Sequence, residues 1–150
     1  MDNNSRSGGM SYAVTVTRQD EQHAVATTRE HELTLNVRKG DGRPGFNAAE
    51  TLLAALGACI LTNVQAIAAK MRLPLEGAKV RFQATRQDEP PALIQVTYEL
   101  TLDSPAPPDK LDELHRLAVK WGTVMNTLSG GLTPEGSLTI HDNGQERKHE

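Results

Sequence analysis

The chain has very little cysteine and few aromatic side chains. Its 150 residues contain one cysteine, Cys59, and aromatic residues make up only 3% of the composition. One cysteine cannot form an internal disulfide bond or a cysteine-rich zinc site. So few aromatic side chains, scattered along the chain, cannot build the stacking surface on which single-stranded nucleic acids are bound. These absences exclude a disulfide-stabilised scaffold, a cysteine-rich zinc module and that class of nucleic-acid binder.

An excess of positive charge is also absent. The 16 lysines and arginines stand against 19 aspartates and glutamates, which gives a formal net charge of −3. The chain therefore lacks the basic footprint of a protein that binds phosphate backbones. We expect no nucleic-acid partner.

Long uninterrupted apolar runs are missing as well. The most apolar stretch, residues 51–70, includes Thr62, Asn63 and Gln65. Its continuous apolar part, LLAALGACIL, is shorter than the ~20 predominantly apolar residues that we expect of a membrane span, and its second half is more polar. Residues 1–10 are polar and glycine-rich and lack the apolar segment of a signal peptide. We therefore expect a cytoplasmic protein with no membrane partner.

Length and composition predict a single domain. A chain of 150 residues is at the usual size of one soluble domain, roughly 100–150 residues. The polar ends predict a disordered leader over residues 1–10 and a polar, unpacked tail over residues 142–150. The domain itself is predicted to cover residues 11–141.

The spacing of apolar residues predicts strands before, between and after helices. Strands are predicted over residues 11–18, 24–28, 31–38, 78–86, 92–102 and 137–141. Helices are predicted from Asn47 to the residues before Pro74, from Pro107 or Pro108 to Trp121, and over residues 123–129. The order β-β-β-α-β-β-α-α-β indicates an α+β fold with a mainly antiparallel sheet.

The long helix has the strongest signals in the sequence. Asn47 is a good N-cap, and Glu50 follows three residues later, where the carboxylate of a capping box belongs. An apolar stripe recurs every three or four residues, at Leu53, Leu56, Ile60, Val64, Ile67 and Met71. Alanines fill much of the remaining surface, so we expect a central helix that other elements approach on several sides.

The sequence does not match three common motifs of nucleotide-binding, metal-binding and serine-dependent sites. The glycine-rich loop 40–45 precedes a helix but lacks the lysine with which a P-loop contacts phosphates. The five histidines show neither HxxxH nor HExxH spacing, so we expect no metal and no cofactor. The sequence around Ser129, TLSGG, lacks the first glycine of a serine nucleophile elbow.

Cys59 is the strongest candidate for chemistry, with two interpretations. A free cysteine inside a helix is often a small buried hydrophobe. A reactive thiol instead needs a lowered pKa and a nearby cation, which Arg38 or Lys39 could supply through the fold. Glu50 is nine residues earlier, about two and a half helical turns, so the two side chains face opposite ways on a straight helix. A joint role would need Glu50 to turn back at the helix start, or a break near Gly57.

Residues 45–59, GFNAAETLLAALGAC, resemble the motif of the OsmC/Ohr superfamily (osmotically inducible protein C and organic hydroperoxide resistance proteins). Glu50 and the closing letters LLAALGAC match the motif position for position, while Ala48 replaces its usual proline. Residues 71–82 resemble the family's link into the next strand. Residues 122–128, GTVMNTL, resemble the family's second-helix motif CPVxNTL.

This resemblance implies an intertwined homodimer in which antiparallel sheets wrap central helices and both active sites lie at the subunit interface. It implies thiol-dependent reduction of organic hydroperoxides in the oxidative-stress response, through a sulfenic acid that a second cysteine resolves. Carried over to this chain, Cys59 would be the peroxidatic cysteine and Arg38, or alternatively Lys39, the guanidinium or ammonium beside it. Glu50 would hold that cation.

The chain departs from the family pattern at Gly122 and Thr123, where the family has its resolving Cys-Pro. With no second thiol, three functions stay open. The first is a one-cysteine peroxidase that uses an external thiol reductant. The second is a non-catalytic protein that binds or senses an apolar small molecule. The third is a protein whose Cys59 attacks some other apolar ligand.

Overall fold

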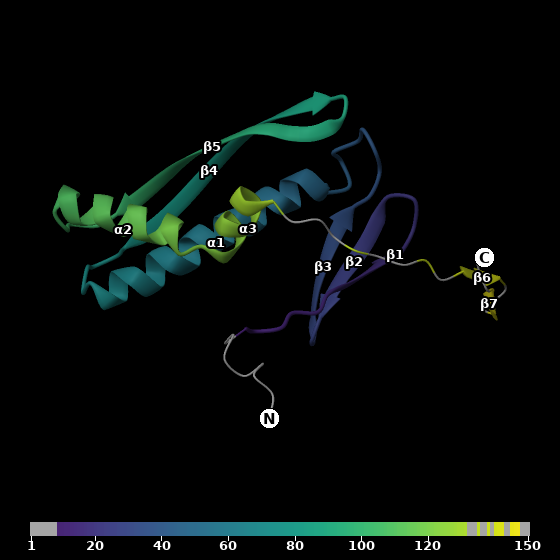
Figure 1. Cartoon of the computed structure of the whole chain (residues 1–150), viewed down its shortest axis with the longest axis horizontal. Helices are drawn as coiled ribbons and strands as arrows, with labels where there is room; N and C mark the ends of the chain where they lie inside the picture. Colours follow the sequence, from purple (N-terminus) through teal and green to yellow (C-terminus); the bar gives the residue numbers. More distant parts are fainter. Residues whose placement is uncertain (1–8, 132–134, 136–137, 139, 143–144, 148–150) are drawn as a thin grey trace. The chain divides into compact units, whose positions relative to one another are not determined.

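The computed structural model describes residues 9–131, 135, 138, 140–142 and 145–147. The elements are β1 (Thr15–Arg18), β2 (His23–Thr28), β3 (His31–Asn36), α1 (Ala48–Lys70), β4 (Gly77–Asp88), β5 (Pro91–Asp103), α2 (Pro108–Lys120), α3 (Thr123–Gly130), β6 (Ile140–Asp142) and β7 (Gln145–Arg147) (Figure 1). The predicted order and the α+β class with antiparallel strands are confirmed. The one added element is β7, which pairs with β6 inside the predicted unpacked tail.

The chain divides into two compact units. The first comprises the described part of Met1–Ala58 together with Ala78–Thr101, and the second comprises Cys59–Gly77 with the described part of Leu102–Glu150. Helix α1 is continuous and contributes its first half to one unit and its second half to the other. Residues 1–8 of the predicted leader lie outside the described residues, so the leader stays a prediction.

The first unit contains an antiparallel sheet in the order β1-β2-β3. Val16 pairs with Ala26, which pairs with Leu33, and residues in such a cross-strand row share one face of the sheet. Val16 is 57% exposed and Leu33 56%. The apolar face that strand alternation creates is therefore largely uncovered within one chain.

Strand β3 ends two residues earlier than the sequence predicts, at Asn36. The Asn36 side chain is buried, and its amide donates hydrogen bonds to the carbonyl oxygens of Asp41, at 2.6 Å, and Gly45, at 3.3 Å. Its Oδ1 accepts a hydrogen bond from the backbone N–H of Arg38 at 2.8 Å. These local bonds turn the chain into the loop that precedes α1, which is why Arg38 leaves the strand.

Strands β4 and β5 form a hairpin that packs closely on the first half of α1. Two residues join the strands, which forces an antiparallel pair. A Cβ placed on Gly57 of α1 would lie 3.1 Å from Phe82 Cε2 and 3.3 Å from Val80 Cγ1. At Gly57 the strand therefore lies so close to the helix that a side chain there would press against Phe82 and Val80.

The second unit packs the later half of α1 with α2. Ile60 and Val64 of α1 and Leu114 and Ala118 of α2 are fully buried. Asn63 donates a hydrogen bond from Nδ2 to the carbonyl oxygen of Ala118 at 3.0 Å, which ties the two helices together. This packing accounts for the apolar periodicity of both helices.

Within one chain, α1 is covered along one face rather than on several sides. The buried stripe contains Leu56, Ile60, Val64 and Ala68. The alanines on its other faces are exposed, namely Ala54, Ala55, Ala58, Ala66 and Ala69. The prediction of a helix covered on several sides is therefore not met by the single chain, because no other described element of the chain lies over those alanines.

The expectation that this segment is too short and too polar for a membrane span was wrong. Helix α1 has 23 residues and is long and apolar enough to cross a membrane by length and composition. Its fully buried stripe, and the hydrogen bond of Asn63 to α2, are nevertheless the pattern of a core helix. Length and composition alone do not separate these two roles.

Candidate functional site

Cys59 is a half-buried free cysteine in α1, and Gly122 contacts it. A Cβ placed on Gly122 would lie 2.9 Å from Cys59 Sγ, 3.2 Å from Met125 Cβ and 3.5 Å from the carbonyl oxygen of Ala118. Gly122 is the N-cap of α3 with φ −80° and ψ 123°, a conformation open to any residue. The backbone at position 122 thus does not restrict the residue type, and the nearest obstacle to a side chain there is the Cys59 thiol.

The residue before Gly122 is the only tryptophan of the chain. Trp121 is 65% exposed, and the ammonium group of Lys120 lies 5.3 Å from the centroid of its ring. Because Trp121 adjoins the glycine that contacts the thiol, its fluorescence is suited to report a chemical change at Cys59.

Glu50 forms the predicted capping box at the start of α1. Its Oε1 accepts a hydrogen bond from the Asn47 backbone N–H at 3.1 Å, and Asn47 Oδ1 accepts one from the Glu50 N–H at 2.9 Å. Of the two arrangements that the spacing left open, Glu50 does turn back at the helix start. The alternative break near Gly57 is wrong, because α1 runs unbroken from Ala48 to Lys70.

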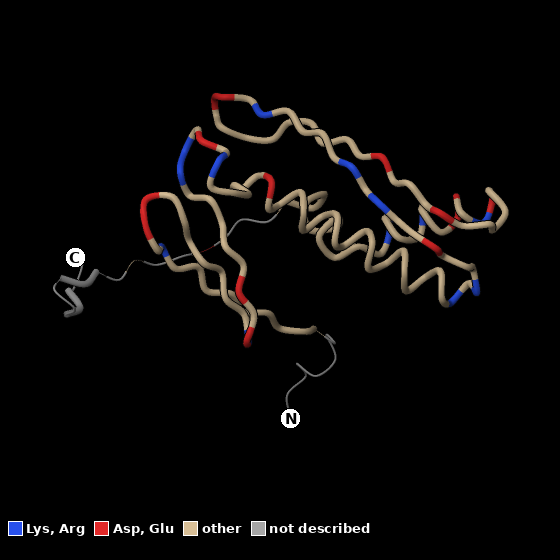
Figure 2. Tube along the Cα trace, turned by 180° about the vertical axis from the view of Figure 1, so that it is seen from behind, with Lys and Arg blue, Asp and Glu red and all other residues tan. Residues whose placement is uncertain are grey.

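Arg38 lies in the loop after β3, beside Asp41. Its Nε is 3.6 Å from Asp41 Oδ2, whereas Arg43 makes two shorter contacts with the same carboxylate, at 2.8 and 3.0 Å. The hydrogen bonds from Arg43 hold the pKa of Asp41 below its ordinary value. Arg43 is thus the main partner of Asp41, and Arg38 is held loosely. Figure 2 shows these charges alternating along the loop.

The three residues predicted to share a site are engaged separately. Glu50 bonds to Asn47 and Arg38 pairs with Asp41, both within the first unit. Cys59 belongs to the second unit, where Gly122 lies beside its Sγ atom. A joint site formed by Cys59, Arg38 and Glu50 stays a prediction.

A cavity of about 600 Å³ opens between the loop after β3, the start of α1 and β4. Residues from these three segments line it: Asn36, Val37, Arg38, Lys39, Gly40, Asp41, Gly42, Asn47, Ala48, Ala49 and Arg86. Arg86 lies about forty residues beyond the loop and carries no local motif, so no sequence pattern predicted it. Only the packing of the hairpin brings it to this cavity.

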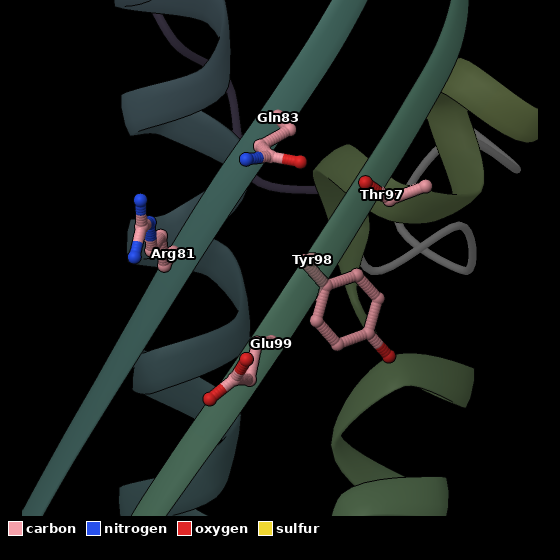
Figure 3. A pocket seen from close by; sticks show the side chains of 5 residues that line it. All are labelled: Arg81, Gln83, Thr97, Tyr98 and Glu99. Carbon is pink, nitrogen blue, oxygen red and sulfur yellow. The ribbon is translucent and has the colours of Figure 1, made fainter.

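A smaller cavity of about 260 Å³ lies on the β4–β5 hairpin. Figure 3 shows its five lining side chains, with Arg81 and Gln83 on one strand and Thr97, Tyr98 and Glu99 on the other. Burial raises the pKa of the Tyr98 phenol above its ordinary value. Among the described residues, no group of three or more histidine, cysteine, aspartate or glutamate side chains could hold a metal ion.

Comparison with known sequences identifies one family. Residues 39–135, more than half of the chain, match the family described as OsmC-like protein. A hydroperoxide reductase from Mycoplasma genitalium is 25% identical over 123 residues, which cover 79% of this chain and 87% of that protein.

Solved structures have the same fold. An OsmC-like protein from Mycoplasma pneumoniae superposes with a TM-score of 0.74 at 21% identity, covering 81% of this chain and 89% of that one. The organic hydroperoxide resistance protein OhrB of Bacillus subtilis superposes with a TM-score of 0.58 at 13% identity, covering 81% and 92%. At these identities the likeness concerns the fold alone.

Proposed function

Because the chain belongs to the OsmC-like protein family, we propose that it reduces organic hydroperoxides through Cys59 as a one-cysteine peroxidase. The observation that carries this proposal is the half-buried thiol of Cys59 facing Gly122, inside the part of the chain that matches the family. The hydroperoxide reductase from Mycoplasma genitalium supports the substrate class.

The proposed reaction has two stages. The Cys59 thiolate attacks one oxygen of the hydroperoxide, so an S–O bond forms as the O–O bond breaks, and the alkoxide leaves as the alcohol after taking a proton. Sulfur is thereby oxidised to sulfenic acid and the peroxide is reduced. An external thiol then attacks that sulfur and releases water, and a second thiol frees Cys59 as the external disulfide departs.

The reductant has to come from outside the chain because Cys59 is the only cysteine. Since such a cycle depends on a pool of reduced thiols, we also propose a cytoplasmic location.

We propose that the active form is a homodimer. Glu50 and Cys59 are about two and a half helical turns apart on α1, and we propose that Cys59 is served by Arg38 and Glu50 of the partner subunit. The exposed alanine faces of α1, and the exposed row of Val16 and Leu33 on the sheet, support this arrangement because exposed apolar patches mark interfaces.

The peroxidase proposal is tested by trapping the intermediate. One equivalent of cumene hydroperoxide should convert Cys59 to a sulfenic acid that dimedone traps, with a change in Trp121 fluorescence on the same time course. Cys59→Ser should give neither signal. A wild-type thiol that survives excess hydroperoxide unmodified would refute the proposal.

Glu50 offers a test that separates capping from catalysis. Glutamine also serves at this capping-box position, so we expect Glu50→Gln to unfold at nearly the wild-type temperature. If the carboxylate charge holds Arg38, the same variant should reduce hydroperoxide at least about tenfold more slowly, as for loss of a charged hydrogen bond. Asn47→Ala, which removes the other half of the box, should cost about 1 kcal/mol of stability. An unchanged rate in Glu50→Gln would exclude the catalytic role.

A second candidate function is non-catalytic binding of an apolar small molecule. It is favoured by the exposed alanine surface of α1, which would then contact the ligand in place of a partner subunit. Such a ligand should raise the melting temperature saturably in both wild type and Cys59→Ala. Loss of the whole response in Cys59→Ala would count against this function.

A further inference from the structure

We propose that the cavity between the β3–α1 loop and β4 binds a phosphate monoester with an apolar organic group. Three cations from two distant segments, Arg38, Lys39 and Arg86, line it, and Asp41 is the only acidic side chain among the described lining residues. The lining therefore carries a formal charge of +2 in a chain whose net charge is −3. A dianion matches that local excess.

The cations are available to a ligand. Within the described part of the chain, Lys39 forms no ion pair. Arg86 pairs with Asp88 at 2.6 Å, but the Asp88 side chain is 95% exposed, and such surface pairs contribute little. Asp41 is occupied chiefly by Arg43, which does not line the cavity.

Backbone donors add to the charge. The N–H groups of Ala48 and Ala49 precede the first intrahelical hydrogen bond, from Thr51 N–H to Asn47 O, and both residues line the cavity. N–H groups at this position have no partner within their helix and favour anions. The convergent side chains carry the proposal, and these donors fit the same ligand.

The remaining lining suits an apolar group. Val37, Ala48 and Ala49 provide aliphatic surface beside the cations. The volume, about 600 Å³, lies within the range of small-molecule sites, roughly 300–1,000 Å³. The cavity thus combines a dianion end with room for a small apolar body. It shares Arg38 with the site proposed for Cys59, but the binding measured below needs no reaction of the thiol.

The test is calorimetric titration of the full-length protein with phenyl phosphate at low ionic strength. We expect saturable binding that is weaker for inorganic phosphate, which lacks the ring, and for benzoate, which carries one charge. Arg86→Gln should bind phenyl phosphate about tenfold more weakly, the loss expected for a charged hydrogen bond. The matched control is Arg81→Gln, which removes the same charge from the same strand outside this cavity and should bind like wild type.

Acidification gives a second readout. Phosphate monoesters lose their second charge below a pKa of about 6, so affinity should fall between pH 7.5 and pH 5 as roughly one charge is lost. Equal melting temperatures of the two arginine variants show that the fold is intact. No saturable binding to wild type, or equal binding to wild type and Arg86→Gln, would overturn the proposal, as would an affinity that does not change with pH.

Discussion

Gly122 has a hydrogen atom where any other residue would place a carbon 2.9 Å from Cys59 Sγ. Carbon–sulfur contacts that short are repulsive, and Met125 Cβ on another side limits the room for adjustment. Since the backbone at 122 is extended and unstrained, the constraint at this residue comes from packing alone. The side chain that position 122 tolerates therefore depends on the side chain at position 59.

A double-mutant cycle measures that coupling. We expect Gly122→Ala to lower the free energy of unfolding by about 1–3 kcal/mol through overpacking. Cys59→Ala removes the sulfur atom, so the second substitution should cost less in that background, with a coupling of roughly 0.5–3 kcal/mol. Denaturant titration of the four proteins gives both values. Strictly additive effects would show that Sγ is not the obstacle.

A thiol at position 122 should bond to Cys59. In a disulfide, the Cβ of one cysteine lies about 3 Å from the sulfur of the other, as follows from an S–S length of about 2.04 Å. A Cβ at position 122 would lie 2.9 Å from Cys59 Sγ, which matches this distance. We expect Gly122→Cys to lose two hydrogen atoms on mild oxidation, as seen by mass spectrometry, and to convert a Cys59 sulfenic acid to the internal disulfide and water without an external thiol. Gly130→Cys, in open space, is the control that should stay reduced.

At the scale of elements, α1 combines a capping box, a buried stripe and one close contact. The box fixes where the helix begins, and the stripe fixes the face that meets α2. Gly57 lies in the same helix and leaves room for Phe82 of β4, whose ring would have to shift slightly to admit even a Cβ there. The helix tolerates the glycine, at a propensity cost of about 1 kcal/mol relative to alanine, because the strand packs there.

Gly57→Val should therefore destabilise the protein by about 1–3 kcal/mol, because its Cβ and methyl groups have to displace Phe82 and Val80. Gly130→Val places the same side chain in a helix with open space around it and should change stability much less. Thermal and denaturant unfolding check both. Equal losses would mean that the helix–strand contact is not the cause.

At the scale of the whole molecule, a single chain leaves many large apolar side chains exposed. The sheet row of Val16 and Leu33 is exposed, as is the alanine surface of α1. Water contact with patches of this kind is unfavourable, and burial in an interface relieves it. A second copy of the chain is the partner that we propose.

Light scattering at micromolar concentration should give the mass of a dimer. Leu33→Glu should shift the population to monomer, because it places a charge in the proposed interface. Thr34→Glu lies on the opposite face of the same strand and should remain dimeric. A wild-type monomer at this concentration would contradict the proposed assembly and, with it, the shared site.

Periodicity and local motifs predicted most of the fold. Alternation located the strands, and Asn47 with Glu50 located the start of α1, because these signals depend on residues a few positions apart. The end of β3 was misplaced because the buried side chain of Asn36 bonds to a loop that alternation does not describe. Strand β7 was missed because its three polar residues carry no apolar signal.

For the site, the sequence by itself determined that one thiol exists, that it lies within the LAALGAC run, and that no second cysteine can resolve it. The tertiary structure decided which groups meet, namely Gly122 against Cys59 Sγ, and Arg86 at the same cavity as Arg38 and Lys39. These neighbours are tens of residues apart in the chain. Local patterns report short-range order, whereas contacts of this range exist only once strands and helices have packed.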